Sequence, residues 1–179
     1  SGDDILNGSL GDDVLFGGDG IDRIVMGFGN DTAHGGAGND VIFERANQLK
    51  AGDKIFGGEG AADTLVIQST GVLDLTLLDT FAGIERVKIA ANQQITSTDD
   101  DLVYIGRSGD ETYGLGAGDD IVKAGGGNDT INGGAGDDFL IGQGGNDIIR
   151  GGAGFDRIIG STDADIFVFE RGGGLDLVF

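Results

Sequence analysis

The sequence predicts an all-β protein, a right-handed solenoid built from short parallel strands. The main observation is a nine-residue unit, G-G-x-G-x-D-x-U-x with U apolar, that runs in register through two blocks of the chain. Glycine occurs 38 times and proline is absent, as expected for tight turns joined by ladders in which proline would remove a donor. A strict period of this length indicates a repeat architecture.

Each position of the unit has a physical role. Positions one to four are rich in glycine, because the chain must turn there through backbone conformations that a Cβ atom disfavours. Positions seven to nine are mostly β-branched or aliphatic and suit a very short strand. Since strand side chains alternate between faces, we expect position eight to point inward and positions seven and nine outward. Such strands are stable only when neighbouring units stack.

Position six carries a carboxylate in every unit of the two blocks. Two units make one coil, so units two apart should lie about 4.8 Å from each other. Like charges at that distance repel by roughly 1 kcal/mol per pair even in water, and stacking therefore calls for a cation between them. Carboxylates and turn carbonyls suit calcium rather than zinc or copper. The predicted ligands are Asp4, Asp13, Asp22, Asp31, Asp40, Asp63, Glu111, Asp120, Asp129, Asp138, Asp147, Asp156 and Asp165.

Pairing each carboxylate with the one two units away predicts about eight core calcium sites, three in the first block and five in the second. Some carboxylates depart from the pattern. Glu111 has a longer side chain than aspartate, and Asp176 follows Asp165 by eleven residues instead of nine. Asp53 and Asp63 lie in stretches with spacing errors. The sequence leaves open whether Glu111, Asp53, Asp63 and Asp176 are ligands.

Units such as GGAGNDVIF at 35–43 resemble the hemolysin-type nonapeptide of the repeats-in-toxin (RTX) family. The resemblance is close over 2–43 and 106–168 and loose over 51–66 and 169–179. It implies a parallel β-roll with calcium between its coils. It also implies a protein that Gram-negative bacteria export unfolded through the type I secretion machinery, and that folds outside the cell or on its surface when it meets calcium. Because the chain starts and stops inside unit-like sequence, we expect a fragment of a larger toxin, adhesin or enzyme.

Three segments follow from the distribution of the units. Residues 1–66 form a first β-roll block, degenerate over 51–66, and residues 106–179 form a second block with a degenerate end. Between them, residues 67–105 lose the glycine period and contain strand-like stretches near Leu75, Val87 and Tyr104. We expect this connecting segment to be calcium-free β-solenoid. A small grafted binding subdomain is the alternative.

Composition excludes several functions. The net charge of −20 opposes binding to nucleic acid or anionic membranes, and no apolar run is long enough for a membrane helix. Cysteine is absent, and no nucleophile motif accompanies the single histidine, His34. We therefore expect no enzyme activity in this chain, and we expect a monomeric calcium-binding module that assists secretion, folding and stability of its parent protein.

The alternative function is a sugar- or ice-binding face on the same solenoid. Ice binding would need a flat ladder of threonines at one turn position. Position three holds a threonine only at Thr162, which argues against ice binding and leaves sugar binding open.

Overall fold

The computed structural model describes residues 1–78, 80–91 and 93–179. These ranges contain short β-strands and one 3-10 helix, Leu75–Leu77, and no α-helix. The chain forms two compact units, the first comprising 1–69 and 74–88 and the second 70–73 and 89–179. Each unit is a parallel β-solenoid, which confirms the predicted fold class. The predicted segment boundaries at residues 66 and 105 stay a prediction.

The first unit has two parallel sheets. One contains β1 (Ile5–Asn7), β3 (Arg23–Val25), β5 (Val41–Glu44), β7 (Thr64–Ile67) and β10 (Arg86–Lys88), in that spatial order. The other contains β2 (Val14–Asp19), β4 (Thr32–Ala37), β6 (Lys54–Glu59) and β9 (Thr80–Ala82). Leu15 pairs with Ala33, one coil of eighteen residues away. Ala33 then pairs with Ile55, 22 residues away, because the chain makes additional turns between β5 and β6.

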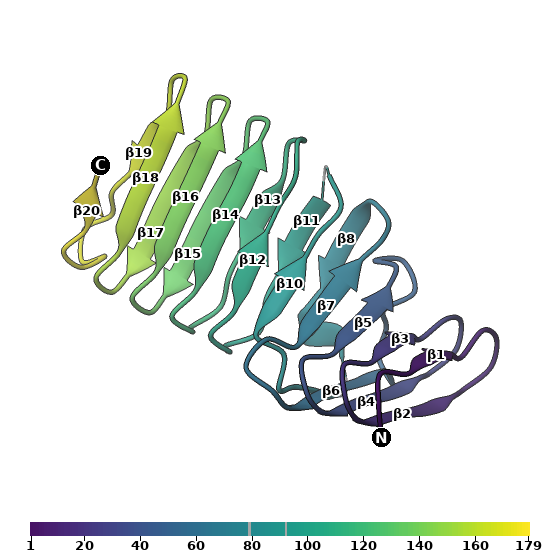
Figure 1. The fold of residues 1–179 in the computed structure, drawn as a ribbon. Coiled ribbons are helices and arrows are strands. Elements are labelled where there is room, and N and C mark those ends of the chain that lie inside the picture. Colours follow the sequence, from purple (N-terminus) through teal and green to yellow (C-terminus); the bar gives the residue numbers. More distant parts are fainter. Residues whose placement is uncertain (79, 92) are drawn as a thin grey trace. The chain divides into compact units, whose positions relative to one another are not determined.

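The second unit also has two parallel sheets (Figure 1). One contains β12 (Val103–Ile105), β14 (Ile121–Gly126), β16 (Phe139–Gly144), β18 (Arg157–Thr162) and β20 (Leu177–Val178). The other contains β8 (Gly71–Asp74, of which the last residue belongs to the first unit), β11 (Gln93–Thr96), β13 (Thr112–Gly114), β15 (Thr130–Ala135), β17 (Ile148–Ala153) and β19 (Ile166–Val168).

Many strands are longer than the repeat predicts. β14, β15, β16, β17 and β18 each contain six residues. Beyond the apolar positions, the glycine-rich positions two and three also pair, as Gly126 does with Gly144. The strand pairing therefore continues through the first glycines of each unit before the chain turns.

Position eight supplies the core of both units, as predicted. Ile24, Ile42, Leu65 and Val87 are fully buried in the first unit, and Tyr104, Val122, Leu140 and Ile158 form a fully buried row in the second. The neighbouring positions seven and nine face outward, and in the six-residue strands of the second unit position one is buried as well, as at Ala124. Among the described residues, no helix is long and apolar enough to cross a membrane.

The coils approach each other so closely that some turns require glycine. Gly145, at position four of its unit, has φ +116°, a conformation that L side chains rarely adopt. A Cβ atom there would also overlap the carbonyl oxygen of Gly127 in the preceding coil. Gly114 differs, because its φ is not in this region and the nearest atom to an added Cβ, the Ile95 carbonyl oxygen, lies at 3.5 Å.

We therefore expect Gly145→Ala to destabilise the calcium-saturated protein by at least about 1–2 kcal/mol, the cost of a left-handed backbone alone. Gly114→Ala, the matched control, should change the free energy of unfolding by no more than about 0.5 kcal/mol. Urea unfolding of both variants measures the difference. Equal destabilisation by the two substitutions would contradict the close approach of the coils at Gly145.

Candidate metal centre

Most of the position-six carboxylates lie in ladders that run along the coils. One ladder of the first unit contains Asp4, Asp22, Asp40, Asp63 and Glu85, and the other contains Asp13, Asp31 and Asp53. One ladder of the second unit contains Asp120, Asp138, Asp156 and Asp176, and the other contains Glu111, Asp129, Asp147 and Asp165.

A hydrogen bond joins each rung of a ladder to the next. The backbone N–H of Asp120 donates to Oδ1 of Asp138, and the N–H of Asp138 donates to Oδ1 of Asp156. All eight carboxylate pairs that the sequence predicts are joined in this way, at 2.7 to 3.0 Å. The structure therefore brings the predicted pairs together in the predicted register, and one oxygen of each acceptor carboxylate is used to hold it.

The second carboxylate oxygen is buried inside the turn. Oδ2 is buried and has no hydrogen-bond partner in nine ladder aspartates: Asp13, Asp22, Asp40, Asp63, Asp120, Asp129, Asp138, Asp147 and Asp156. Such an atom is costly unless something compensates for its lost hydration. The same geometry recurs in both units, so the feature belongs to the repeat.

Seven of these oxygens face a glycine at or beside the start of their own unit. Those of Asp120 and Asp129 do not, because Leu115 and Ala124 occupy position one in their units. A Cβ atom at Gly133 would overlap both Oδ2 of Asp138 and the carbonyl oxygen of Gly151 in the next coil. The missing Cβ therefore leaves a small cradle bounded by a carboxylate oxygen and a peptide oxygen. These are the hard donors that calcium prefers.

Side chains alone do not complete a site. Among the residues that the structure describes, no three His, Cys, Asp or Glu side chains gather in a way that could hold a metal ion. A cation in the cradle would need backbone carbonyls as further ligands, which the glycine turns supply.

Burial makes these carboxylates hard to ionise. It raises the pKa of Asp120, Asp129 and Asp138 to about 7, and it also raises the pKa of Asp147 and Asp156. The N–H donated from the preceding coil lowers these pKa values in part, while neighbouring carboxylates raise them further. A positive charge beside the ladder would relieve both effects.

The two aspartates that the sequence left open in the first unit differ from each other. Oδ2 of Asp53 accepts the backbone N–H of Lys50 at 3.0 Å, so the additional turn before β6 supplies its partner. Oδ2 of Asp63 is buried without a partner. Asp63 therefore matches the other ladder aspartates, whereas Asp53 has both oxygens occupied.

At the end of the second unit, Asp176 is only partly buried, and its Oδ1 accepts the N–H of Asp156 at 3.4 Å. Glu111 is buried, and its N–H donates to Oδ1 of Asp129 at 2.7 Å. Asp4 is exposed and Asp165 partly buried, as expected at the two ends of the solenoid coils.

Glu85 is a ladder member that sequence reasoning missed. Its Oε2 accepts the backbone N–H of Asp63 at 2.8 Å, and β10, the strand that starts at the next residue, pairs with β7. The available signal was its place two residues before the buried Val87, the same offset as between positions six and eight. Gly83 is the only glycine in the five residues before it, and the loss of the other turn glycines concealed this role.

A second ladder, at position five, was also missed. Oδ1 of Asp119 accepts the N–H of Asp137 at 2.7 Å, and Oδ1 of Asp137 accepts the N–H of Phe155 at 2.8 Å. These bonds point in the opposite direction along the solenoid from those of position six. Asn128 and Asn146 make the same contact, so this ladder needs a carbonyl-type oxygen and no charge.

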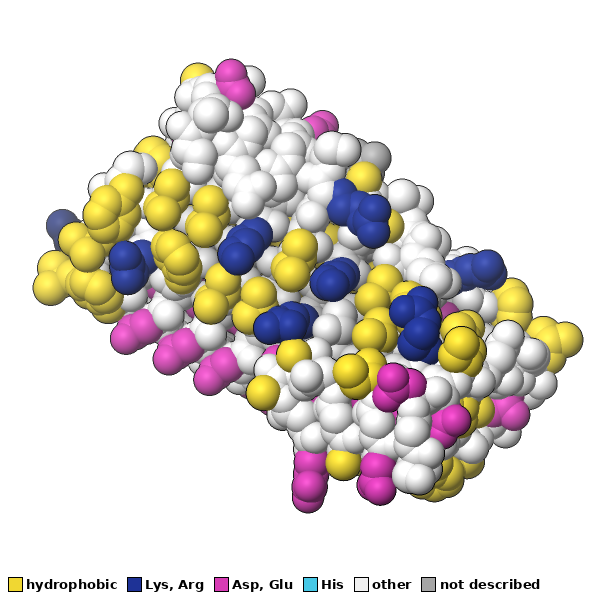
Figure 2. Space-filling model, in the orientation of Figure 1, with side chains coloured by type: hydrophobic (Ala, Val, Ile, Leu, Met, Phe, Trp, Pro, Cys, Tyr) yellow, Lys and Arg dark blue, Asp and Glu magenta, His cyan; other side chains and the backbone are white. Residues whose placement is uncertain are grey.

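Several bases of the second unit lie away from the ladders. In the second unit, Lys123 and Arg157 are exposed on the outer face of their sheet, and the Arg157 guanidinium lies 5.3 Å from the centre of the Phe139 ring. Figure 2 shows Lys and Arg side chains among hydrophobic ones on the strand faces, with acidic side chains along the edges. These bases do not reach into the turns.

Fold and site together define a β-solenoid with repeated oxygen-donor cation cradles. The family model for the RTX calcium-binding nonapeptide repeat matches residues 1–24, 16–43, 105–140, 114–149 and 141–175, which together cover more than half of the chain. The chain belongs to this family, as its resemblance predicted, and its repeats are calcium-binding repeats. A comparison with curated proteins gives no significant match.

The raised pKa values predict how acid affects the metal-free chain. In the folded state Asp120, Asp129 and Asp138 have pKa values of about 7, above the ordinary value of 3.8. At pH 8 they are charged in both states, and their burial opposes folding. As the pH falls through 7, the folded chain takes up protons that the unfolded chain does not yet bind, so folding becomes more favourable down to about pH 4. Circular dichroism in chelator at pH 8, 6.5 and 5 should show increasing β-structure, and a decrease would contradict the burial of these groups.

Proposed function

We propose that this chain is a calcium-dependent folding module of a larger exported protein, and that the predicted position-six carboxylates are its calcium ligands. The observation that carries the proposal is the set of nine buried Oδ2 atoms that lack a partner, seven of which face a glycine. The chain itself would have no enzyme activity, would act as a monomer, and would hold about eight core ions, one for each pair of stacked carboxylates.

Each proposed site combines residues from neighbouring coils. In the central case, Asp138 provides Oδ2 and the coil above provides the carbonyl oxygen of Gly151. Bound calcium would supply the positive charge that the buried carboxylates lack. The rung hydrogen bonds fix the side chains, and the glycines keep the turn open.

Because the ligands of one site are a full coil apart in the sequence, they come together only in the folded chain. Binding energy is then folding energy. Without calcium, the carboxylates of adjacent coils repel each other and lose hydration on burial. The chain should therefore stay unfolded wherever calcium is scarce.

This dependence supports a role in export. Membership of the RTX family and the calcium requirement favour a parent protein that passes through the type I secretion machinery of a Gram-negative bacterium while unfolded. Folding would follow outside the cell or at its surface, where calcium is abundant. The module would then assist secretion, folding and stability of its parent, whether a toxin, an adhesin or an enzyme.

The test is a calcium titration of the chain followed by far-UV circular dichroism. In chelator at pH 8 we expect little β-structure, and millimolar calcium should produce it cooperatively, with an affinity per site of about 10⁻⁴–10⁻³ M. Magnesium is the matched control and should fail, because it demands a tighter octahedron and gives up its water reluctantly. Full β-structure in chelator would overturn the proposal.

Two neighbouring aspartates distinguish the ligand ladder from the structural one. Asp138→Asn keeps an Oδ1 for the N–H of Asp120 but removes the charge from two proposed sites, and we expect the calcium midpoint to rise about tenfold, equivalent to about 1.4 kcal/mol. Asp137→Asn makes the same chemical change one residue away, at an exposed position where other units carry asparagine. It should leave the midpoint unchanged.

Asp165→Asn should have an intermediate effect, because Asp165 is joined to the ladder only through Asp147. Calcium titrations of the three variants by circular dichroism rank them. If Asp137→Asn raised the midpoint as much as Asp138→Asn, position six would not be the ligand position.

A further inference from the structure

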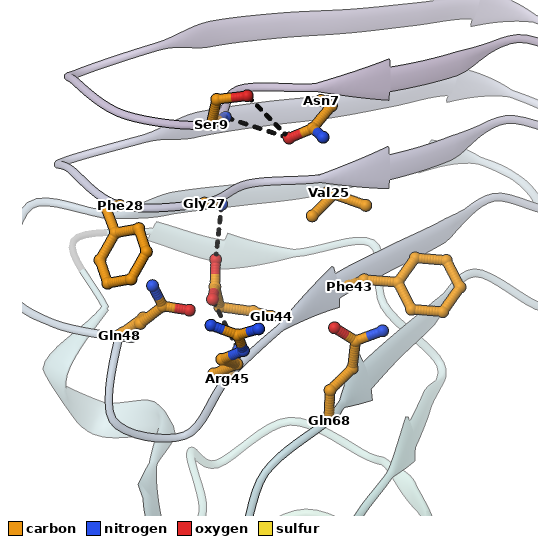
Figure 3. Close-up of a pocket in the computed structure, with 10 residues that line it drawn as sticks. All are labelled: Asn7, Ser9, Val25, Gly27, Phe28, Phe43, Glu44, Arg45, Gln48 and Gln68. Carbon is orange, nitrogen blue, oxygen red and sulfur yellow. Dashed lines mark hydrogen bonds between the residues drawn. The ribbon is translucent and has the colours of Figure 1, made fainter.

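The first unit contains a pocket of about 210 Å³ beside the end of β5 (Figure 3). None of the carboxylates of the ladders lines it, so the calcium repeat does not account for it. Its volume is below the roughly 300–1,000 Å³ of pockets that hold drug-sized ligands. The pocket therefore suits one small ring.

The pocket is built where the chain departs from its repeat. Glu44 occupies position one, which is glycine in units such as those starting at Gly17 and Gly35. Additional turns follow it before β6 and provide Arg45 and Gln48 as pocket walls. The repeat needs neither the glutamate nor the additional turns, so both are specific to this place in the solenoid.

Fixed polar groups surround the pocket. Glu44 is only 4% exposed, and its carboxylate accepts the backbone N–H groups of Gly27 and Arg45 at 3.2 and 2.6 Å. The Gln48 Nε2 atom is buried and has no hydrogen-bond partner, and its amide lies beside the Glu44 carboxylate in Figure 3. A rotation of the Gln48 side chain would bring this donor to a ligand oxygen, and the contact would be favourable because an unmade buried hydrogen bond is costly.

Two further amides and an aromatic ring complete the lining. Asn7 is held in place because its Oδ1 accepts both the N–H and the hydroxyl of Ser9. Gln68 lines the pocket from the coil that follows. Phe28 is 54% exposed at the rim. An aromatic ring exposed beside a pocket offers an apolar face to a ligand.

The charges at the pocket favour a neutral ligand. One carboxylate and one guanidinium, from Glu44 and Arg45, line it together, so an anion or a cation would meet a like charge as well as an opposite one. Burial raises the pKa of Glu44 to about 7, and this carboxyl can therefore donate to or accept from a ligand near neutral pH. Hydroxyl groups, which both donate and accept, match this set of amide and carboxyl groups.

We propose that this pocket binds a single neutral, hydroxyl-rich ring, a pyranose sugar, with Gln48 and Glu44 hydrogen-bonding its hydroxyl groups and Phe28 packing against its C–H face. The sugar is either free or the terminal residue of a glycan. The site would be independent of the calcium ladders, and it would give the module a binding function in addition to its folding function.

The test is a titration of the ¹⁵N-labelled full chain, in saturating calcium, with D-glucose, D-galactose, D-mannose and N-acetylglucosamine, each as the free sugar and as its methyl glycoside. At least one should give saturable shifts of the Gln48 side-chain amide and the Gly27 backbone amide. Binding of the methyl glycoside as well as the free sugar identifies a glycan end as the ligand, and binding of the free sugar alone identifies a free sugar.

Gln48→Ala should abolish the saturable shifts, whereas Gln94→Ala, at an exposed glutamine of β11 in the second unit, should retain them. If Gln48→Ala changes the circular dichroism spectrum, Gln68→Ala takes its place. The absence of saturable shifts with all eight probes would overturn the proposal, as would their loss in Gln94→Ala. Calcium dependence of folding is measured separately, so failure of one proposal does not imply failure of the other.

Discussion

The hydrogen bond from the amide of one ladder residue to Oδ1 of the next underlies the structure of both units. It sets the register of adjacent coils and fixes the carboxylate that accepts it. With Oδ1 held by the neighbouring coil, Oδ2 faces into the turn, where in most units a glycine leaves room for it. The period of the sequence, the turn glycines and the buried negative charge are thus all linked to this one hydrogen bond.

The departures from the period show that the ladder sets the register and that chain length does not. Asp31 and Asp53 are 22 residues apart, and Asp40 and Asp63 are 23 apart, yet the rung bonds remain at 2.8 and 2.7 Å. The surplus residues leave the coil as turns, because a loop costs little conformational entropy compared with loss of the ladder. One such loop donates the Lys50 N–H to Asp53, so local chain geometry can take over the task proposed for a cation elsewhere.

The fold and the position-six carboxylate ladders could be predicted because their residues recur every nine positions. Position eight is buried and position six is stacked wherever the pattern holds, and each is visible in the sequence as a column of one residue type. Glu85 and Asp53 could not be assigned in this way, since the role of each depends on where an irregular segment rejoins the coil. The position-five ladder was missed for another reason. Aspartate and asparagine both occur there, a mixture equally typical of a solvated turn, and only the folded structure shows Oδ1 of Asp137 on the amide of Phe155.

The distribution of charge determines what can balance the ladders. The strand bases of the second unit extend from the outer faces of its sheets, where Arg157 packs on the Phe139 ring and Arg150 pairs with Glu170 at 2.8 Å. A side chain long enough to enter a turn would need the space that glycine keeps free beside Asp138. Protons can neutralise the Asp138 carboxylate only when the pH falls below its pKa of about 7. At higher pH the remaining candidate is an ion that accepts carboxylate and carbonyl oxygens in loose geometry. On the proposed function, the turns that make the coils compact would also make their folding depend on that ion.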